Sequence, residues 1–120
     1  MAAALGYAGD ALWIVAMAII ASTSRGALRR LPAGVRVPIS WSSGRRPTWR
    51  ASRGAAFTLA IAIPLVVGLA LLAAGRLADP SDVLLVFLIR AATAPLFALA
   101  HIVWLRTALR TLEDEGAVKP

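Results

Sequence analysis

Asp10, Arg90 and His101 are ionisable side chains that lie inside long apolar stretches of this sequence. A charge inside a membrane-spanning helix is costly, and it normally pairs with an opposite charge or lines a cavity. Arg90 lies roughly 12 Å into its stretch at about 1.5 Å per helical residue, and Asp10 lies at a comparable depth. We therefore predict an Asp10–Arg90 ion pair. The alternatives are that Arg90 reaches the surface while Asp10 sits near a helix start, or that the two contact another protein or a cofactor.

His101 is the only histidine and stands near the end of its apolar stretch. A histidine at such depth can ligate haem or bacteriochlorophyll through a ring nitrogen. A lone histidine three residues before Trp104 also fits an ordinary side chain at a membrane–water interface, which is the interpretation we favour. We therefore expect no bound cofactor, with haem or bacteriochlorophyll at His101 as the alternative.

No combination of residues in the sequence indicates catalysis. The single histidine has no nucleophile and carboxylate near it in sequence, and the chain has no cysteine. A glycine-rich phosphate loop and metal-ligand spacing are also missing from the sequence. We predict that the protein is not an enzyme and holds no metal.

The elements that carry these residues are three apolar stretches. Hydrophobic residues make up 59% of the chain and charged residues 16%, against about 45–50% and about 25% in soluble domains. A membrane span needs about 20 residues, and each stretch reaches that length. The sequence therefore predicts an all-α integral membrane protein with three transmembrane helices, at about 2–22, 55–75 and 83–112, in one membrane domain over 1–120.

The connections between these helices differ in length and charge. A long basic loop is expected over 23–54, a short turn over 76–82 and a polar tail over 113–120. In the turn, Asp79 or Ser81 could cap the third helix, with Pro80 or Asp82 in its first turn. Within the second helix, Pro64 should loosen the backbone locally.

Eight arginines and no acid lie between residues 22 and 54. We expect this loop to contact anionic lipid headgroups or an acidic surface of a partner protein, and nucleic acid is not expected because no soluble basic domain remains outside the helices. Alternation of apolar and polar residues predicts an extended segment over 35–41, followed by a turn over 42–44. The predicted contact residues are Arg29, Arg30, Arg36, Arg45, Arg46, Arg50, Arg53, Trp41 and Trp49.

The charges also predict the orientation of the chain. With three helices, the loop and the C-terminus share one side, where Arg106, Arg110 and Lys119 add to the loop arginines. The other side carries only Arg76. By the positive-inside rule, the loop and the C-terminus are cytoplasmic, the N-terminus is outside, and the location is a bacterial inner membrane.

The loop contains a recurring pattern of proline, glycine and tryptophan: Leu31-Pro32, then 37–41 (Val-Pro-Ile-Ser-Trp), then 44–49 (Gly-Arg-Arg-Pro-Thr-Trp). On these residues the loop resembles that of a family of small bacterial membrane proteins, whose domain of unknown function also occurs in SdpI-type immunity proteins. That family's loop reads approximately L-P-x-x-V-P-x-H-W-x-x-x-G-x-P and precedes a hydrophobic helix. Ser40 stands where the family has histidine. The resemblance implies the membrane architecture, and it places the family's loop outside the cytoplasm, opposite to the charge argument.

Three functions fit these features. The first is a non-catalytic accessory subunit of a larger bacterial membrane complex, respiratory or photosynthetic, because small residues on the third helix allow a neighbouring helix to pack closely. The second is a stand-alone SdpI-like immunity or signalling protein that binds a peptide or regulator through its loop. The third is a small transporter or channel subunit, which would need to oligomerise to form a path.

Overall fold

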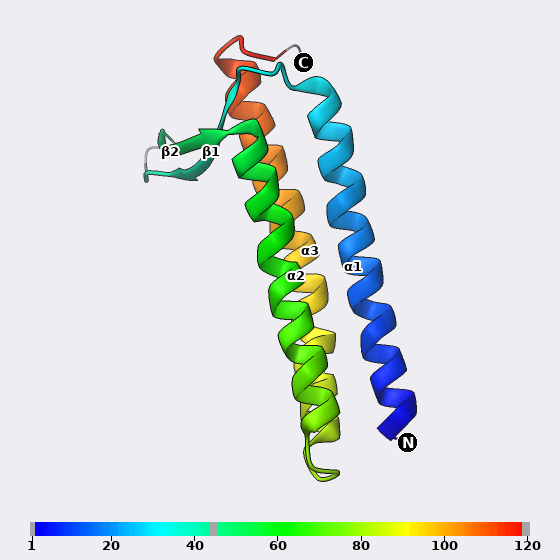
Figure 1. Cartoon of the computed structure of the whole chain (residues 1–120). Coiled ribbons are helices and arrows are strands. Elements are labelled where there is room, and N and C mark those ends of the chain that lie inside the picture. Colours follow the sequence, from blue (N-terminus) through cyan, green and yellow to red (C-terminus); the bar gives the residue numbers. More distant parts are fainter. Residues whose placement is uncertain (1, 44–45, 119–120) are drawn as a thin grey trace.

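The described part of the chain folds into three long helices and one short β-hairpin (Figure 1). The computed structural model describes residues 2–43 and 46–118. The helices are α1 (Ala2–Arg30), α2 (Arg53–Leu77) and α3 (Val83–Asp114), and all three are long and apolar enough to cross a membrane. They form an elongated bundle of 54 × 29 × 19 Å. The N-terminus lies at one end, and the hairpin and the C-terminal segment lie at the other.

Helix α1 is longer than the sequence predicted, because it continues past residue 22 to Arg30. Thr23 and Ser24, which fall in the predicted loop over 23–54, are accommodated inside the helix. Thr23 donates its hydroxyl to the carbonyl of Ile19 at 2.7 Å, and Ser24 bonds to α3. Both hydroxyls therefore find partners while the backbone stays helical: the Thr23 hydroxyl bonds one turn back on its own helix, and the Ser24 hydroxyl bonds across to His101.

Helices α1 and α3 run in the same direction and share a continuous buried seam. Along both helices the buried residues recur at every third or fourth position, which keeps them on one face. The seam residues of α1 are Trp13, Ala16, Ile20, Ser24 and Ala27, and those of α3 are Arg90, Ala94, Ala98, His101, Leu105, Ala108 and Leu112. The many alanines let the two backbones approach closely.

Helix α2 runs antiparallel to the other two (Figure 1). Ser52 caps its start, where the side-chain oxygen accepts a hydrogen bond from the amide of Ala55 at 3.2 Å. Pro64 is buried inside the helix, which continues through it to Leu77. Gly68 receives the indole of Trp13 from α1, since a Cβ at Gly68 would stand 2.8 Å from Trp13 Cε3.

The all-α prediction is incomplete, because the segment expected to be a basic loop contains an antiparallel β-hairpin. Its strands are β1 (Arg36–Trp41) and β2 (Pro47–Ser52). Val37 pairs with Ala51, and both side chains are buried. The alternation over 35–41 predicted the first strand, and the second completes the backbone pairing that a lone strand would lack. Gly44 of the predicted turn and Arg45 lie outside the described residues.

The turn before α3 does not use the predicted side-chain caps. Asp82, and not Asp79 or Ser81, is the N-cap residue, and its side chain makes no capping hydrogen bond. The turn is closed by backbone instead, with the amide of Asp82 donating to the carbonyl of Asp79 at 2.8 Å. Helix α3 then continues to Asp114, two residues beyond the predicted end at 112.

Two buried clusters divide the core. The smaller one surrounds Trp13 in the middle of the bundle, with Ala16, Ala94 and Ala98. The larger one lies at the hairpin end and joins the ends of all three helices to the hairpin. Its buried members are Ala27, Leu31, Val37, Ala51, Ala56, Phe57, Leu105, Ala108, Leu112 and Val118. The hairpin is therefore a packed part of the fold.

Candidate functional site

Asp10 of α1 and Arg90 of α3 form an ion pair inside the bundle. Arg90 Nη2 lies 2.6 Å from Asp10 Oδ1, and the Arg90 side chain is only 5% exposed. A second nitrogen, Nη1, donates to the backbone carbonyl of Gly6 at 3.5 Å. A buried guanidinium is stabilised only when an opposite charge and further acceptors surround it, and this arrangement supplies both.

A glycine of α1 stands directly beside this pair. A Cβ at Gly9 would lie 2.6 Å from Arg90 Nη1 and 2.9 Å from Cζ, so the guanidinium packs against the backbone of α1 and would have to shift if a larger residue stood there. The other carboxylate oxygen of Asp10 faces Arg76 of α2, at 4.0 Å. One carboxylate therefore lies between two guanidiniums that come from the two other helices.

Two hollows adjoin this cluster. A cavity of about 280 Å³ lies at the N-terminal end of the bundle, and Tyr7, Asp10, Arg76 and Arg90 are its polar lining residues. A groove of about 460 Å³ runs between α1 and α2, with Asp10 and Arg90 among otherwise apolar and tryptophan side chains. Both hollows are lined by Asp10, Leu72 and Arg90, so they meet at the ion pair.

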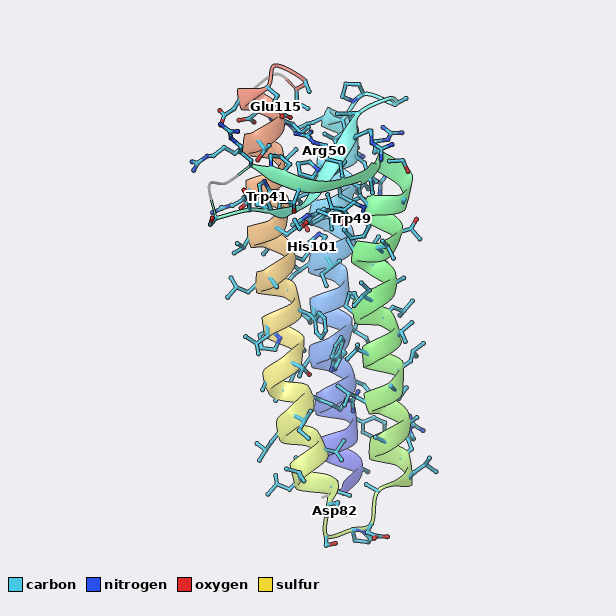
Figure 2. The ribbon with its side chains drawn as sticks, turned by 90° about the vertical axis from the view of Figure 1, so that its left-hand side faces the viewer. Trp41, Trp49, Arg50, Asp82, His101 and Glu115 are labelled. Carbon is cyan, nitrogen blue, oxygen red and sulfur yellow. The ribbon has the colours of Figure 1, made fainter. Side chains whose placement is uncertain are left out.

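His101 lies on the same seam, closer to the hairpin (Figure 2). Its Nε2 is 2.9 Å from the Ser24 hydroxyl, and its ring stands 5.5 Å from the ring of Trp104. The side chain is 6% exposed. A haem or bacteriochlorophyll ligand needs a ring nitrogen open to the metal, and here the Ser24 hydroxyl occupies the approach to Nε2. This environment does not fit a cofactor ligand at that nitrogen.

The predicted contact arginines divide into two groups. Three of them bind within the chain: Arg30 pairs with Glu113 at 2.7 Å, Arg50 pairs with Glu115, and Arg53 donates to the carbonyl of Leu31 at 2.8 Å. A fourth, Arg36, donates to the carbonyl of Arg50 across the hairpin at 3.2 Å. The side chains of Arg29 and Arg46 are exposed, and Arg45 lies outside the described residues.

The tryptophans at this end have two different roles. Trp41 donates its indole N–H to the hydroxyl of Thr111 at 3.2 Å, and Trp104 donates to the carbonyl of Pro38 at 3.1 Å. These two bonds attach β1 to α3. Trp49 is 54% exposed on the hairpin, although its size and apolar ring would favour burial in water. Figure 2 shows Trp41, Trp49 and His101 gathered where the hairpin meets the helices.

Sequence reasoning missed three of these partners. Ser24 falls in the predicted loop over 23–54, and Glu113 and Glu115 fall in the predicted polar tail over 113–120. Each binds a residue more than 60 positions away in the chain. No local pattern marks such partners, because they depend on the packing of the helices.

Comparison with known proteins adds no relative. No family model, no curated protein and no solved structure matches this chain. Over residues 2–43 and 46–118, histidine, aspartate and glutamate nowhere form a group of three that could hold a metal ion. The charged groups around Asp10 offer electrostatic chemistry of their own: the guanidiniums of Arg76 and Arg90 can bind an anion, and the carboxylate balances one of them.

Proposed function

We propose that this chain is an integral protein of a bacterial inner membrane and serves as a non-catalytic accessory subunit that packs against a larger complex, respiratory or photosynthetic. Its N-terminus and the 79–82 turn would lie outside, and its hairpin and C-terminal segment would lie in the cytoplasm. The proposal depends most on one observation: each helix has a long apolar surface that the chain itself leaves uncovered.

The exposed surface of the helices supports both membrane insertion and a packing role. Only 17–22% of the most apolar window of each helix is buried inside the chain. The uncovered residues include Leu65 and Val66 on α2 and Leu96, Leu99 and Val103 on α3. Soluble monomers rarely expose apolar patches of such extent. Lipid can cover this surface, and so can the apolar helices of a neighbouring subunit.

Helix lengths and the position of the hairpin support the placement in the bilayer. The 22 residues from Val83 to Trp104 span about 33 Å, close to the roughly 30 Å hydrocarbon core of a bilayer. Trp104 bonds to the hairpin at Pro38, so the hairpin would lie in the headgroup layer. Trp49 and the exposed Arg46 would then contact the interface and its anionic lipids.

Copurification tests the accessory role. A tagged chain extracted from membranes of its native host in mild detergent should migrate on a native gel with a large haem- or pigment-containing complex, and mass spectrometry should identify the same partners in repeated preparations. The control is an unrelated membrane protein of the same host that has three transmembrane helices and carries the same tag. Migration as a lone small particle would contradict the accessory role.

A stand-alone SdpI-like protein is the second candidate, and the hairpin favours it. The pattern residues Leu31, Pro38 and Trp41 hold the hairpin against the helices by burial or by a hydrogen bond. A hairpin that is packed on the helices and exposes Trp49 and Arg46 suits a binding surface for a peptide or regulator. Reversible binding through the hairpin, lost in Trp49→Ala and retained in a monomeric preparation, would favour this function over the first.

A further inference from the structure

The two hollows beside Asp10 and Arg90 together have the form of a site for an elongated molecule with one polar end. The cavity at the end of the bundle contains the charged groups, while the groove between α1 and α2 is lined mainly by apolar side chains. The groove is lined on the α1 side by Trp13, Ile14 and Met17, and on the α2 side by Pro64, Leu65, Gly68 and Leu69. Ligand sites of this kind combine an apolar lining with a few fixed polar groups.

The charges at the polar end favour an anion. Arg76 and Arg90 together carry two positive charges, and Asp10 balances only one of them. Arg90 is 4% exposed, and its Nε has no hydrogen-bond partner among the described residues. The side chain of Arg76 is 70% exposed, and its Nη2 lies 4.0 Å from Asp10 Oδ2. It can therefore turn toward a ligand that enters the cavity at the end of the bundle. Guanidinium groups bind phosphate oxygens through paired hydrogen bonds.

We propose that the cavity and the groove form a binding site for one anionic phospholipid, with its phosphate at Arg76 and Arg90 and an acyl chain along the groove. The site lies at the opposite end of the bundle from the hairpin arginines. It rests on the membrane placement proposed above, since the groove then opens toward lipid. A phosphate group and a hydrocarbon chain are both needed, because the two hollows differ in polarity.

Native mass spectrometry of the full chain in detergent provides the test. The probes are phosphatidylglycerol, phosphatidylcholine with the same acyl chains, and inorganic phosphate. We expect a one-to-one phosphatidylglycerol complex that survives at activation energies at which the phosphatidylcholine complex dissociates, and no stabilisation by inorganic phosphate. Equal retention of the two lipids would overturn the proposal. Equal protection by inorganic phosphate would also overturn it, because the groove would then be irrelevant.

Matched variants separate the two parts of the site. Arg76→Gln should weaken retention of phosphatidylglycerol by about fivefold, as expected for one arginine near an anionic group, whereas Arg106→Gln at the other end should leave it unchanged. Ile14→Trp should block the groove. The control Val15→Trp changes the neighbouring residue, which is 57% exposed and lines neither hollow. Unchanged retention in both Arg76→Gln and Ile14→Trp would refute the site.

Failure of this site would differ from failure of the membrane placement. A chain that stays dispersed in buffer without lipid or detergent would contradict the proposed function itself. A chain that requires detergent but binds both lipids alike would contradict only the phospholipid site.

Discussion

Gly9 of α1 lies directly against the guanidinium of Arg90 on α3, and a Cβ at that position would meet Nη1 at 2.6 Å. The same guanidinium is tied to α1 by Asp10, the next residue, at 2.6 Å, so a shift away from Gly9 would strain this ion pair. The lack of a side chain at Gly9 therefore lets the guanidinium lie close to α1, and its ion pair joins two residues that are 80 positions apart in sequence.

Gly9→Ala should destabilise the bundle by about 1–3 kcal/mol, the usual cost of forcing extra atoms into a packed site. Thermal unfolding in mild detergent, followed by circular dichroism, measures the change. Gly6→Ala is the control on the same helix, since a Cβ there meets nothing within 4 Å. Because alanine is the better helix former by about 1 kcal/mol, Gly6→Ala should leave stability equal or higher. Equal loss in both variants would mean that the close approach at Gly9 is unimportant.

Asp10→Asn should remove the charge that balances Arg90 and leave a guanidinium with 5% exposure unpaired. Breaking a buried pair costs about 3–5 kcal/mol, and the 27% exposure of Asp10 reduces the expected loss to roughly 2 kcal/mol. The double variant Asp10→Asn with Arg90→Met should recover much of the lost stability, because no uncompensated charge remains. An unchanged melting temperature in Asp10→Asn would show that the pair does not stabilise the fold.

The parts of this site that sequence predicted are those that depend on local composition. Asp10 and Arg90 each stand alone in an apolar helix at similar depth, so the energetic cost of an unpaired charge was enough to suggest the pair. The bond between Ser24 and His101 had no such signal. It depends on α1 continuing beyond residue 22, and serine in a hydroxyl-rich stretch is common at a helix end.

The hairpin, too, could be predicted only where a local sequence pattern marks it. The alternation over 35–41 indicated an extended segment, because a strand with one buried face has a period of two. The second strand, Pro47–Ser52, has no clear alternation, and only its pairing with β1 and its packing on the helices define it. The ion pairs of Glu113 and Glu115 could not be predicted from local sequence either. They form because α3 extends to Asp114 and so brings these acids near Arg30 and Arg50.

Ser24→Ala should test the second polar contact of the seam. His101 would lose its partner at Nε2 and remain buried, which costs about 1–3 kcal/mol for an unsatisfied polar group. Ser22→Ala is the matched control, because Ser22 lies on the exposed side of the same helix. The difference in melting temperature between the two variants reports the contact directly. A Ser24→Ala protein as stable as the Ser22→Ala protein would show that the hydrogen bond contributes nothing.

Arg53→Gln should weaken the junction between α1 and α2. Its guanidinium donates to the backbone carbonyl of Leu28, in the last turn of α1, at 3.4 Å and to that of Leu31, just after the helix, at 2.8 Å. Loss of a charged hydrogen bond of this kind costs about 1.5–3 kcal/mol. Arg46→Gln, at an exposed position of the hairpin, should change stability by less than about 0.5 kcal/mol. Hydrogen exchange at the end of α1 should rise in the first variant only.

Single cysteines can test the proposed orientation, because the chain has none of its own. Ser81→Cys lies in the turn before α3, and Ser43→Cys lies in the turn of the hairpin at the opposite end of the bundle. If the basic side is cytoplasmic, a membrane-impermeant maleimide added to intact spheroplasts should label the first variant and spare the second until the membrane is opened. Leu99→Cys, on an uncovered apolar face of α3, should resist labelling in both cases because hydrocarbon surrounds it. Labelling of Ser43→Cys alone in intact spheroplasts would place the hairpin outside the cytoplasm. That result would agree with the resemblance to the SdpI-type loop and would contradict the orientation inferred from the arginines.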